Sequence, residues 1–486
     1  MDTVALERLD SFPYRHRVTD IMSAPIVAVA ATVTVTEAVR TMMQRHVSSV
    51  VVLDRDGRLD GILTEHDVLR TIARDPAYLA NAVAQTMTRP VNSIDADALA
   101  YRALARMARL GVRHLPVIDD SGRPLGMLTA RSLVRQRASQ ALTLGDEIDQ
   151  APDAAALRSA FGKLPSLAAG LRGEDVSAVQ VAAVIAGVTR DVTARAGELA
   201  LTAMRVQGRG DAPANWCLLV LGSAGRGETL LIPDQDNALV HDGNESADSW
   251  FATFGEQLAV LLDAAGVPFC KGGVMASNPA FRRSLAHWCE AIDSWIDRPR
   301  PEALLNVDIF YDFVPVLGDR SLARALRQHA VTTAAKSPVF LRLLAAASER
   351  SGSAFDLLGR LRTEAGRVDL KLRGLFPIVA GARAIALAWK SAATSTDSRL
   401  AESAAKGALP PDTAGDLTAA RAEIVEVILD QQLADVAAGQ APSTRVDPKR
   451  LKRAGLRRLR KALAVAGEAS EGVREALTNR SLGRAP

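Results

Sequence analysis

Two aspartates that follow a glycine-rich turn are the residues best suited to chemistry in this chain. The turn, residues 222–228 (Gly-Ser-Ala-Gly-Arg-Gly-Glu), comes directly after an apolar run, and Asp234 and Asp236 lead into a second apolar run. Alternate residues of a strand point to the same face, so these two carboxylates are expected side by side. They repel each other unless a cation lies between them, and such oxygen ligands suit Mg²⁺ together with substrate phosphates. The glycine turn lets backbone N–H groups approach those phosphates.

The turn does not match the sequence patterns of two other phosphate-binding loops. A P-loop requires Gly-Lys-Ser/Thr after its glycines, and none follows here. Gly222, Gly225 and Gly227 do not have the Gly-x-Gly-x-x-Gly spacing of a dinucleotide-binding loop. A Gly-Ser turn or an Asp-x-Asp pair alone is common in ordinary turns and on solvated surfaces. The order strand, Gly-Ser, Arg, Glu, Asp-x-Asp, strand is much more specific, and it predicts a site for nucleotidyl transfer.

This ordered motif resembles the DNA polymerase β-like nucleotidyltransferase superfamily. More narrowly, it resembles the bacterial nucleotidyltransferases related to PII uridylyltransferase and to glutamine synthetase adenylyltransferase. The resemblance implies a mixed-sheet domain that takes ATP or UTP as substrate and holds Mg²⁺ or Mn²⁺ on Asp234 and Asp236. It implies that the nucleoside triphosphate is bound by residues of the turn, namely Gly222, Ser223, Arg226 and Glu228.

A third metal-binding acid lies on a later strand in that superfamily, and the matching segment here is 306–316. The family's Phe-Asp-Phe-Arg pattern falls on residues 311–314, which favours Asp312 as a catalytic and metal ligand. Asp308 remains the alternative, because an even spacing would place both carboxylates on one side of a strand. Val314 stands where the family usually has an arginine, so one partner for a phosphate or for the acid departs from the pattern.

The resemblance extends toward the C-terminus. Residues 270–279 match a glycine-containing loop of the narrower family, and residues 369–379 with Ala382-Arg383 resemble the opening of its helical substrate-binding domain. From the residues alone, Lys371 and Arg373 are better explained as solvated helix charges. Cys270 by itself is better explained as a small buried hydrophobe.

The first part of the chain contains an internal repeat. Gly-Ile-Leu-Thr at 61–64 recurs as Gly-Met-Leu-Thr at 126–129, and the same 65-residue offset relates Met22 to Met87, Val47 to Val112 and Asp54 to Asp119. A fixed offset indicates two copies of one structural unit. Each copy is expected to contain a helix (36–45; 97–110) and, as judged from the first copy, a hairpin. That hairpin joins runs 49–53 and 59–63, and a second helix begins near residue 65.

This repeat resembles a pair of cystathionine β-synthase-type (CBS) domains, because residues 61–67 match their Gly-x-x-Thr-x-x-Asp signature. The resemblance implies that AMP, ADP or ATP binds the pair, at Gly61, Thr64 and Asp67 in the first copy and at Thr129 and Arg131 in the second. Ser132 replaces the aspartate in the second copy, so the first copy is expected to bind the ribose more tightly. As a residue on its own, Thr64 is equally well explained as a helix cap.

The composition limits the class of protein. With 59 basic and 55 acidic residues, the formal net charge of +4 does not call for a nucleic-acid partner. No run approaches the 20 or so apolar residues of a membrane helix, and the acidic N-terminus is not a signal peptide. Three scattered cysteines exclude a disulfide framework or a zinc site and fit a reducing cytoplasm.

These features predict a multidomain protein of the α/β and α+β classes. The expected parts are the tandem CBS domains at 18–138 (copies 18–75 and 83–138), a helical connector at 142–210, a nucleotidyltransferase domain at 211–320 and an all-α substrate-binding domain at 321–486.

The predicted function is metal-dependent transfer of a nucleotidyl group to a protein acceptor in bacterial signal transduction, regulated by adenine nucleotides on the CBS pair. Resemblance to other CBS pairs also implies a homodimer formed through these domains. The alternative is a nucleotide-sensing regulatory protein whose transferase fold is inactive. The intact Asp-x-Asp pair favours the enzyme, whereas Val314 favours the regulator.

Overall fold

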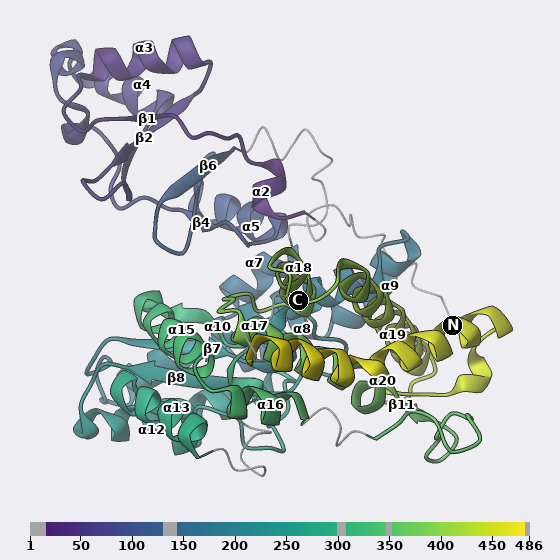
Figure 1. Cartoon of the computed structure of the whole chain (residues 1–486). Coiled ribbons are helices and arrows are strands. Elements are labelled where there is room, and N and C mark those ends of the chain that lie inside the picture. Colours follow the sequence, from purple (N-terminus) through teal and green to yellow (C-terminus); the bar gives the residue numbers. More distant parts are fainter. Residues whose placement is uncertain (1–15, 130–142, 299–307, 347–351, 482–486) are drawn as a thin grey trace. The chain divides into compact units, whose positions relative to one another are not determined.

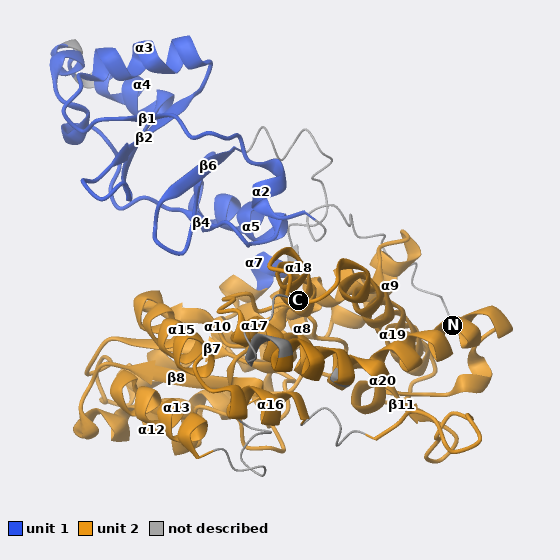
Figure 2. Ribbon diagram, viewed as in Figure 1, with its two compact units in different colours: residues 1–147 blue, residues 148–486 orange. Residues whose placement is uncertain are grey.

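The structure is a computed structural model that describes residues 16–129, 143–298, 308–346 and 352–481. The chain divides into two compact units, residues 1–147 and 148–486, which Figure 2 colours separately. Helix α7 (Thr143–Gln150) carries residues of both units. Among the described residues, no helix combines the length and the apolar character that crossing a bilayer requires.

The first unit consists of two copies of one fold, each with a three-stranded sheet (Figure 1). The first copy contains β1 (Ala28–Val29), α3 (Val35–Arg45), β2 (Ser49–Leu53), β3 (Leu59–Thr64) and α4 (Glu65–Arg74). The second contains β4 (Ile94–Asp95), α5 (Ala100–Leu110), β5 (His114–Ile118) and β6 (Pro124–Thr129). The bounds of α3, β2 and β3 recur in α5, β5 and β6 with an offset of 65 residues, which confirms the predicted internal repeat.

Both copies use the same residues to form their hairpins. Asp54 accepts hydrogen bonds from the N–H groups of Asp56 and Arg58, and Gly57 follows with a φ of 76°. In the second copy Asp119 accepts the equivalent bonds, and Gly122 has a φ of 82°. An aspartate that bonds to its own turn and a glycine in the left-handed region together fix the strand register.

The strands of the first unit are buried on both faces. Val50, Val52 and Leu63 pack with the buried face of α3, whereas Val51 and Ile62 pack with Met127 of the second copy. This two-sided burial explains why these strands are continuous apolar runs rather than alternating ones.

The second unit is built on a four-stranded mixed sheet with the order β10-β7-β8-β9. These strands are β7 (Trp216–Val220), β8 (Asn237–His241), β9 (Arg282–Ser284) and β10 (Val314–Gly318). β7 is antiparallel to both β10 and β8, and β8 is parallel to β9. This arrangement confirms the mixed sheet that was expected for the nucleotidyltransferase domain.

Helices cover both faces of this sheet (Figure 1). On one face α10 (Ala178–Val206) contacts β7, β10 and α12 (Glu245–Ala264), and the absent side chain of Gly197 lets α10 approach Leu218 and Leu317. On the other face α13 (Leu285–Asp297) and α15 (Arg320–Ala334) pack with Cys217 and Leu219 in one hydrophobic core. Short helices α8 (Ala154–Phe161) and α9 (Leu164–Gly173) contact α10.

The C-terminal region is helical, as predicted, apart from the two-residue strands β11 (Val368–Asp369) and β12 (Arg445–Val446). Its helices are α16 (Pro338–Ala346), α17 (Phe376–Ala388), α18 (Thr396–Ala405), α19 (Pro411–Ala437) and α20 (Arg453–Ser481). α17 is buried along nearly its whole length, and α16, α18 and α20 contact it. Its core is continuous with that of α13 and α15. The four-part division of the chain at residues 142, 211 and 321 stays a prediction.

Candidate functional site

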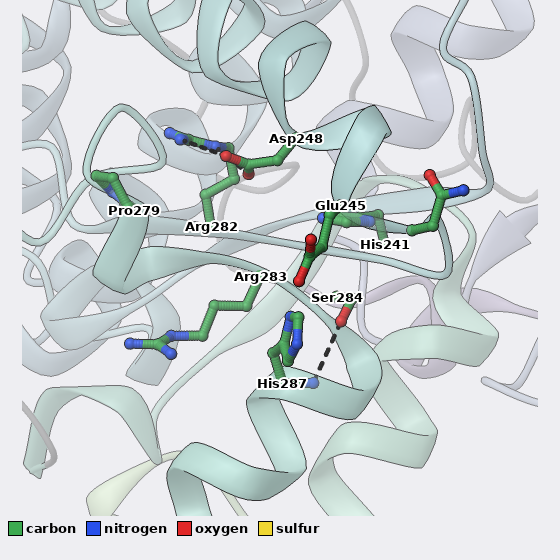
Figure 3. Close-up of a pocket in the computed structure, with 9 residues that line it drawn as sticks. His241, Glu245, Asp248, Pro279, Arg282, Arg283, Ser284 and His287 are labelled. Atoms are coloured by element: carbon green, nitrogen blue, oxygen red, sulfur yellow. Dashed lines mark hydrogen bonds and ion pairs between the residues drawn. The ribbon is translucent and has the colours of Figure 1, made fainter.

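A group of polar residues lies beyond each end of strand β8. Beyond His241, at its C-terminal end, lies a cavity of about 300 Å³ (Figure 3). It is lined by His241, Asn244, Glu245, Asp248, Pro279, Arg282, Arg283, Ser284 and His287. Arg282 is buried and donates to both carboxylate oxygens of Asp248 and to the carbonyl oxygens of Ala276 and Ser277. This guanidinium therefore supports the wall of the cavity, and no predicted site residue lies there.

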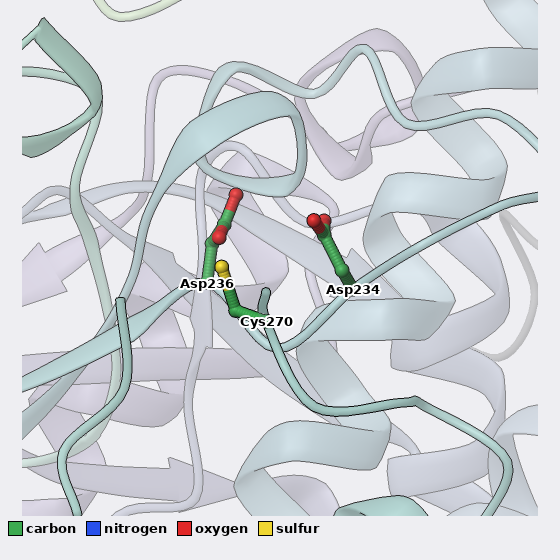
Figure 4. Close-up of side chains that lie close together, drawn as sticks. All are labelled: Asp234, Asp236 and Cys270. Carbon is green, nitrogen blue, oxygen red and sulfur yellow. The ribbon is translucent and has the colours of Figure 1, made fainter. Parts of the chain in front are cut away.

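The predicted metal pair lies before the other end of β8. Asp234, Asp236 and Cys270 each offer a ligand atom, and these atoms lie within 4.8 Å of one another (Figure 4). The prediction that both aspartates lie on a strand was wrong, because β8 begins at Asn237. Their carboxylates come together because the Asp236 N–H donates to the Asp234 carbonyl oxygen at 3.0 Å, which tightens the chain between them.

The intervening Gln235 anchors this segment. Its side chain is buried, and its amide nitrogen donates to the carbonyl oxygens of Ala259 and Val267. The Gln235 N–H also donates to the Pro268 carbonyl oxygen at 3.1 Å. Because the central residue points into the core, Asp234 and Asp236 both point away from it.

The glycine turn contacts the metal pair directly. Gly222 has a φ of 59°, and a Cβ atom there would lie 2.3 Å from Oδ2 of Asp236. The Leu221 N–H donates to the carbonyl oxygen of Asp236 at 2.8 Å, which joins the end of β7 to the approach to β8. Only glycine satisfies both the left-handed backbone and the close contact, so the prediction that places Gly222 in this site has a clear physical basis.

The electrostatics of the pair fit a divalent cation. Oδ1 of Asp236 is buried and has no hydrogen-bond partner among the described residues. Burial, followed by the charge of Asp234, raises the pKa of Asp236 to about 6. Burial also raises the pKa of Cys270 to about 11, so its sulfur stays a thiol that hydrogen bonds to Asp236. The two carboxylates offer the oxygen ligands that Mg²⁺ and Mn²⁺ prefer.

The remaining residues of the turn already have partners within the protein. Ser223 Oγ lies 3.1 Å from Oγ1 of Thr229. Arg226 donates to Glu228 at 2.9 Å and also to Asp312. Glu228 in turn accepts bonds from the N–H and the hydroxyl of Thr396, at the start of α18. The turn is therefore tied to the C-terminal helices as well as to the metal pair.

Asp312 and Asp308 have a different environment from the metal pair. Asp312 is fully buried and receives hydrogen bonds from Arg226, Arg383 and Arg399, while Asp308 receives one from Arg383. Burial alone would raise the pKa of Asp312, but the three guanidiniums hold it well below its usual range. Neither residue belongs to the group of ligand atoms that the structure assembles around Asp234 and Asp236.

The prediction that Asp308 and Asp312 share a strand was wrong. Residues 308–310 are helical, residues 311–312 form a turn, and β10 begins only at Val314. A spacing of four residues places side chains on one face of a helical turn as well as on one face of a strand. The even spacing therefore identified the shared face but not the element that produces it.

Val314 stands where the family usually has an arginine, and two arginines of the C-terminal helices bind Asp312 instead. Arg383 of α17 and Arg399 of α18 bind Asp312, at distances in sequence of 71 and 87 residues. Arg383 could have been noticed in the sequence, because it interrupts the otherwise apolar segment 376–388. Arg399 lies in an ordinary polar helix, so no local signal marks it.

Lys371 also has an electrostatic effect on the metal pair. Its charge lowers the pKa of Asp236, against the larger effects of burial and of Asp234. Lys371 opens a π-helical turn, Lys371–Leu375, that leads into α17. Lys371 is exposed, as the sequence predicted for a solvated charge, and its charge also acts on Asp236.

In the first CBS copy, the predicted nucleotide-binding residues form a helix cap. Thr64 accepts a hydrogen bond from the Asp67 N–H, and Asp67 accepts bonds from the N–H and hydroxyl of Thr64. Arg70 binds the other oxygen of Asp67 at 2.7 Å. Gly61 has no room for a side chain, since a Cβ atom would lie 2.2 Å from the sulfur of Met87.

In the second copy Thr129 ends β6, in the position that corresponds to Thr64. Arg131 and Ser132 lie outside the described residues. The roles assigned to the residues of both copies stay predictions.

Comparison with known families agrees with this organisation. Residues 162–302 match "Putative nucleotidyltransferase DUF294", residues 338–477 match "Putative nucleotidyltransferase substrate binding domain", and residues 18–74 and 82–139 match the CBS domain.

Individual relatives cover smaller parts of the chain. An uncharacterized 17.7 kDa protein of Acidianus ambivalens is 32% identical over 120 residues, which are 24% of this chain and 71% of that protein. The L-aspartate semialdehyde sulfurtransferase of Methanocaldococcus jannaschii is 24% identical over 27% of this chain and only 25% of its own length. A crystal structure of a CBS domain pair with 5′-methylthioadenosine and S-adenosyl-L-methionine is 25% identical, with a TM-score of 0.23, over 25% of this chain and 94% of that one.

The chain therefore belongs to the CBS-domain proteins, and it joins a CBS domain pair to regions that match the DUF294 family and the substrate-binding domain associated with that family.

Proposed function

We propose that this protein is a metal-dependent nucleotidyltransferase that transfers the nucleotidyl group of ATP or UTP to a hydroxyl of a protein acceptor, in the manner of PII uridylyltransferase. The observation that carries the proposal is the contact between Gly222 and Asp236, because it brings the glycine turn beside two carboxylates, one of which has a buried oxygen with no hydrogen-bond partner among the described residues. A cation and a triphosphate would satisfy this site together.

In the proposed reaction, Asp234 and Asp236 would hold Mg²⁺ or Mn²⁺, which would supply Lewis-acid polarisation when bound. The backbone N–H groups of the turn, Ser223 and Arg226 bind the β- and γ-phosphates. The acceptor oxygen forms a bond to the α-phosphorus, the bond from that phosphorus to the bridging oxygen breaks, and pyrophosphate leaves. The proton of the acceptor hydroxyl passes to water.

Asp312 has a positioning part in this proposal. Arg383 and Arg399 hold its carboxylate, which in turn orients Arg226 beside the turn, and it would join the cation only by exchanging one of its guanidinium partners. Glu228 has a similar part, because it binds both Arg226 and the start of α18.

We further propose that AMP, ADP or ATP binds the CBS pair at Thr64 and Asp67, and that this binding regulates transfer. Helices of the CBS pair would form a homodimer, and the protein would act in signal transduction in the bacterial cytoplasm. The cap around Thr64 supports the nucleotide site, because a hydroxyl at a helix N-terminus can bind phosphate.

The experiment is to incubate the full-length protein with ATP or UTP that carries label on the α-phosphate, Mg²⁺ or Mn²⁺, and a bacterial lysate. Transfer predicts label on a protein band, and none when the label is on the γ-phosphate. The Asp234→Asn/Asp236→Asn variant is the matched control and should give no band. A wild-type protein that binds nucleotide at the CBS pair but never transfers label would instead be a nucleotide-sensing regulator.

A further inference from the structure

The helix that carries the nucleotide-binding turn is held from outside by one arginine. α11 (Gly222–Arg226) has only five residues, and the last carbonyl groups of any helix lack partners within it. The Gly227 N–H reaches the carbonyl oxygen of Ala224 at 3.2 Å, and further donors come from Arg190, in the middle of α10. Its Nε donates to the carbonyl oxygen of Ala224 at 2.7 Å, and its Nη2 donates to that of Gly225 at 2.8 Å.

These two bonds fix the orientation of the turn as well as its distance from α10. The planar guanidinium directs its donors in a rigid fork, so two bonds to adjacent carbonyls define the plane of the backbone between them. Ala224 and Gly225 lie between Ser223 and Arg226, which bind triphosphate in the proposed function. A rotation of this peptide would therefore move both phosphate-binding side chains.

The opposite side of the turn leaves no space for adjustment. A Cβ atom on Gly225 would lie 2.1 Å from the carbonyl oxygen of Asp312 and 2.9 Å from that of Val220. The backbone of Gly225 is thus clamped between the sheet and the Asp312 turn on one side and the Arg190 guanidinium on the other.

We propose that Arg190 is a positioning residue for nucleoside triphosphate binding: it sets the conformation of residues 222–226 so that Ser223 and Arg226 meet the β- and γ-phosphates. This inference rests on the proposed function, and it adds a residue from the segment that the sequence alone predicted to be only a connector. Arg190 acts through the turn and does not itself contact the reacting atoms.

The same helix offers a matched control. Arg195 also uses Nε and Nη2 to hold a carbonyl oxygen, that of Ala151, at 3.0 and 2.8 Å. It also binds Glu198 on α10, but none of its recorded partners belongs to the nucleotide turn. Loss of either side chain removes a paired guanidinium–carbonyl contact from α10, whereas only loss of Arg190 releases the turn.

The experiment measures binding of UTP with Mg²⁺ by calorimetry, and of ATP with Mg²⁺ in an Asp67→Ala background that weakens the CBS site. The variants are Arg190→Met, Arg190→Lys and Arg195→Met, each with its thermal unfolding midpoint. We expect Arg190→Met to weaken triphosphate binding about tenfold or more, and Arg195→Met to change it less than about twofold. Arg190→Lys keeps the charge but loses the fork, so it should recover only a small part of the affinity.

Equal triphosphate affinities for Arg190→Met and Arg195→Met, with comparable unfolding midpoints, would overturn the positioning role and leave the proposed function intact. Full recovery by Arg190→Lys would show that charge alone matters, which also overturns it. If the parent protein binds neither UTP nor ATP outside the CBS pair, the proposed function fails and this inference fails with it.

Discussion

Two pairs of aspartates in one domain have opposite environments. Asp234 and Asp236 are partly exposed, lie close together, and leave one buried oxygen without a partner. Asp308 and Asp312 are buried and are bound by Arg226, Arg383 and Arg399. Among the described residues, arginine side chains form ion pairs with the second pair but not with the first. The surroundings of an acidic pair therefore decide whether it can serve as a metal site or as a structural support.

The pKa values express the same difference. Burial and the charge of Asp234 raise the pKa of Asp236 to about 6, because they outweigh the opposing effects of Cys270, Lys371 and Arg226. The pKa of Asp312 is held well below its usual range despite its deeper burial, because three guanidiniums outweigh desolvation.

The largest expected effect is the loss of nucleotidyl transfer when Asp234 and Asp236 are replaced. Asp234→Asn/Asp236→Asn should reduce transfer by at least about 1,000-fold, because it removes the ligands of the Lewis acid. The unfolding free energy should change little, since neither aspartate forms an ion pair with another described residue. Initial rates and denaturant unfolding of the same preparation check both points, and near-normal rates would contradict the role of the pair.

Substitution of a residue in the buried pair, Asp308 and Asp312, should instead have its large effect on stability. Asp312→Asn should lower the free energy of unfolding by about 3–5 kcal/mol, because it leaves buried guanidiniums without their carboxylate. Denaturant unfolding measures this loss. Combining Asp312→Asn with Arg399→Met should restore part of the lost free energy of unfolding, since the second change removes one uncompensated charge. A stability equal to that of wild type would show that the cluster does not hold the domain together.

The stability contributed by Asp312 should depend on pH in one direction. Its folded-state pKa is lowered, so the contribution is fully present above the unfolded pKa of about 3.9 and is lost as the pH falls through the lower folded value. The difference in unfolding free energy between wild type and Asp312→Asn should therefore be constant from pH 7 to about pH 5 and narrow below about pH 4. A difference that widens in acid would have the wrong sign.

Asp67 of the CBS pair is an intermediate case, and the smallest effect is expected there. Its carboxylate has partners, but they are the neighbouring Thr64 and the half-exposed Arg70, which ribose hydroxyls can replace at low cost. Asp67→Ala should weaken adenine nucleotide binding about tenfold, as expected from the loss of most of one charge-assisted bond. Calorimetry with AMP, ADP and ATP checks this value, and Thr129→Ala should have less effect if the copy with Ser132 is the weaker site.

The sequence was most informative where function and fold depend on local spacing. The expected runs 49–53 and 59–63 match β2 and β3 to within one residue, and the 65-residue offset carries the same bounds to β5 and β6, because each hairpin is specified by its own turn. The Asp-x-Asp pair was predictable for the same reason, although a tight turn rather than a strand joins its carboxylates.

The sequence could not show the partners of Asp312 or of the nucleotide turn. Arg399 lies 87 residues from Asp312, and Arg190 lies 34 residues before Ala224, so no periodic pattern links them. Only the packing of α10, α17 and α18 around the sheet brings these guanidiniums to their carbonyl and carboxylate partners.

Binding of Mn²⁺ tests the central claim most directly, because it needs neither an acceptor nor a chosen nucleotide. Titration of wild type, Asp234→Asn/Asp236→Asn and Asp312→Asn can be followed by electron paramagnetic resonance of free Mn²⁺. The account predicts a site in wild type that the double variant loses and that folded Asp312→Asn retains. If the double variant kept the Mn²⁺ site, or if only Asp312→Asn lost it, the claim that Asp234 and Asp236 bind the metal would be contradicted.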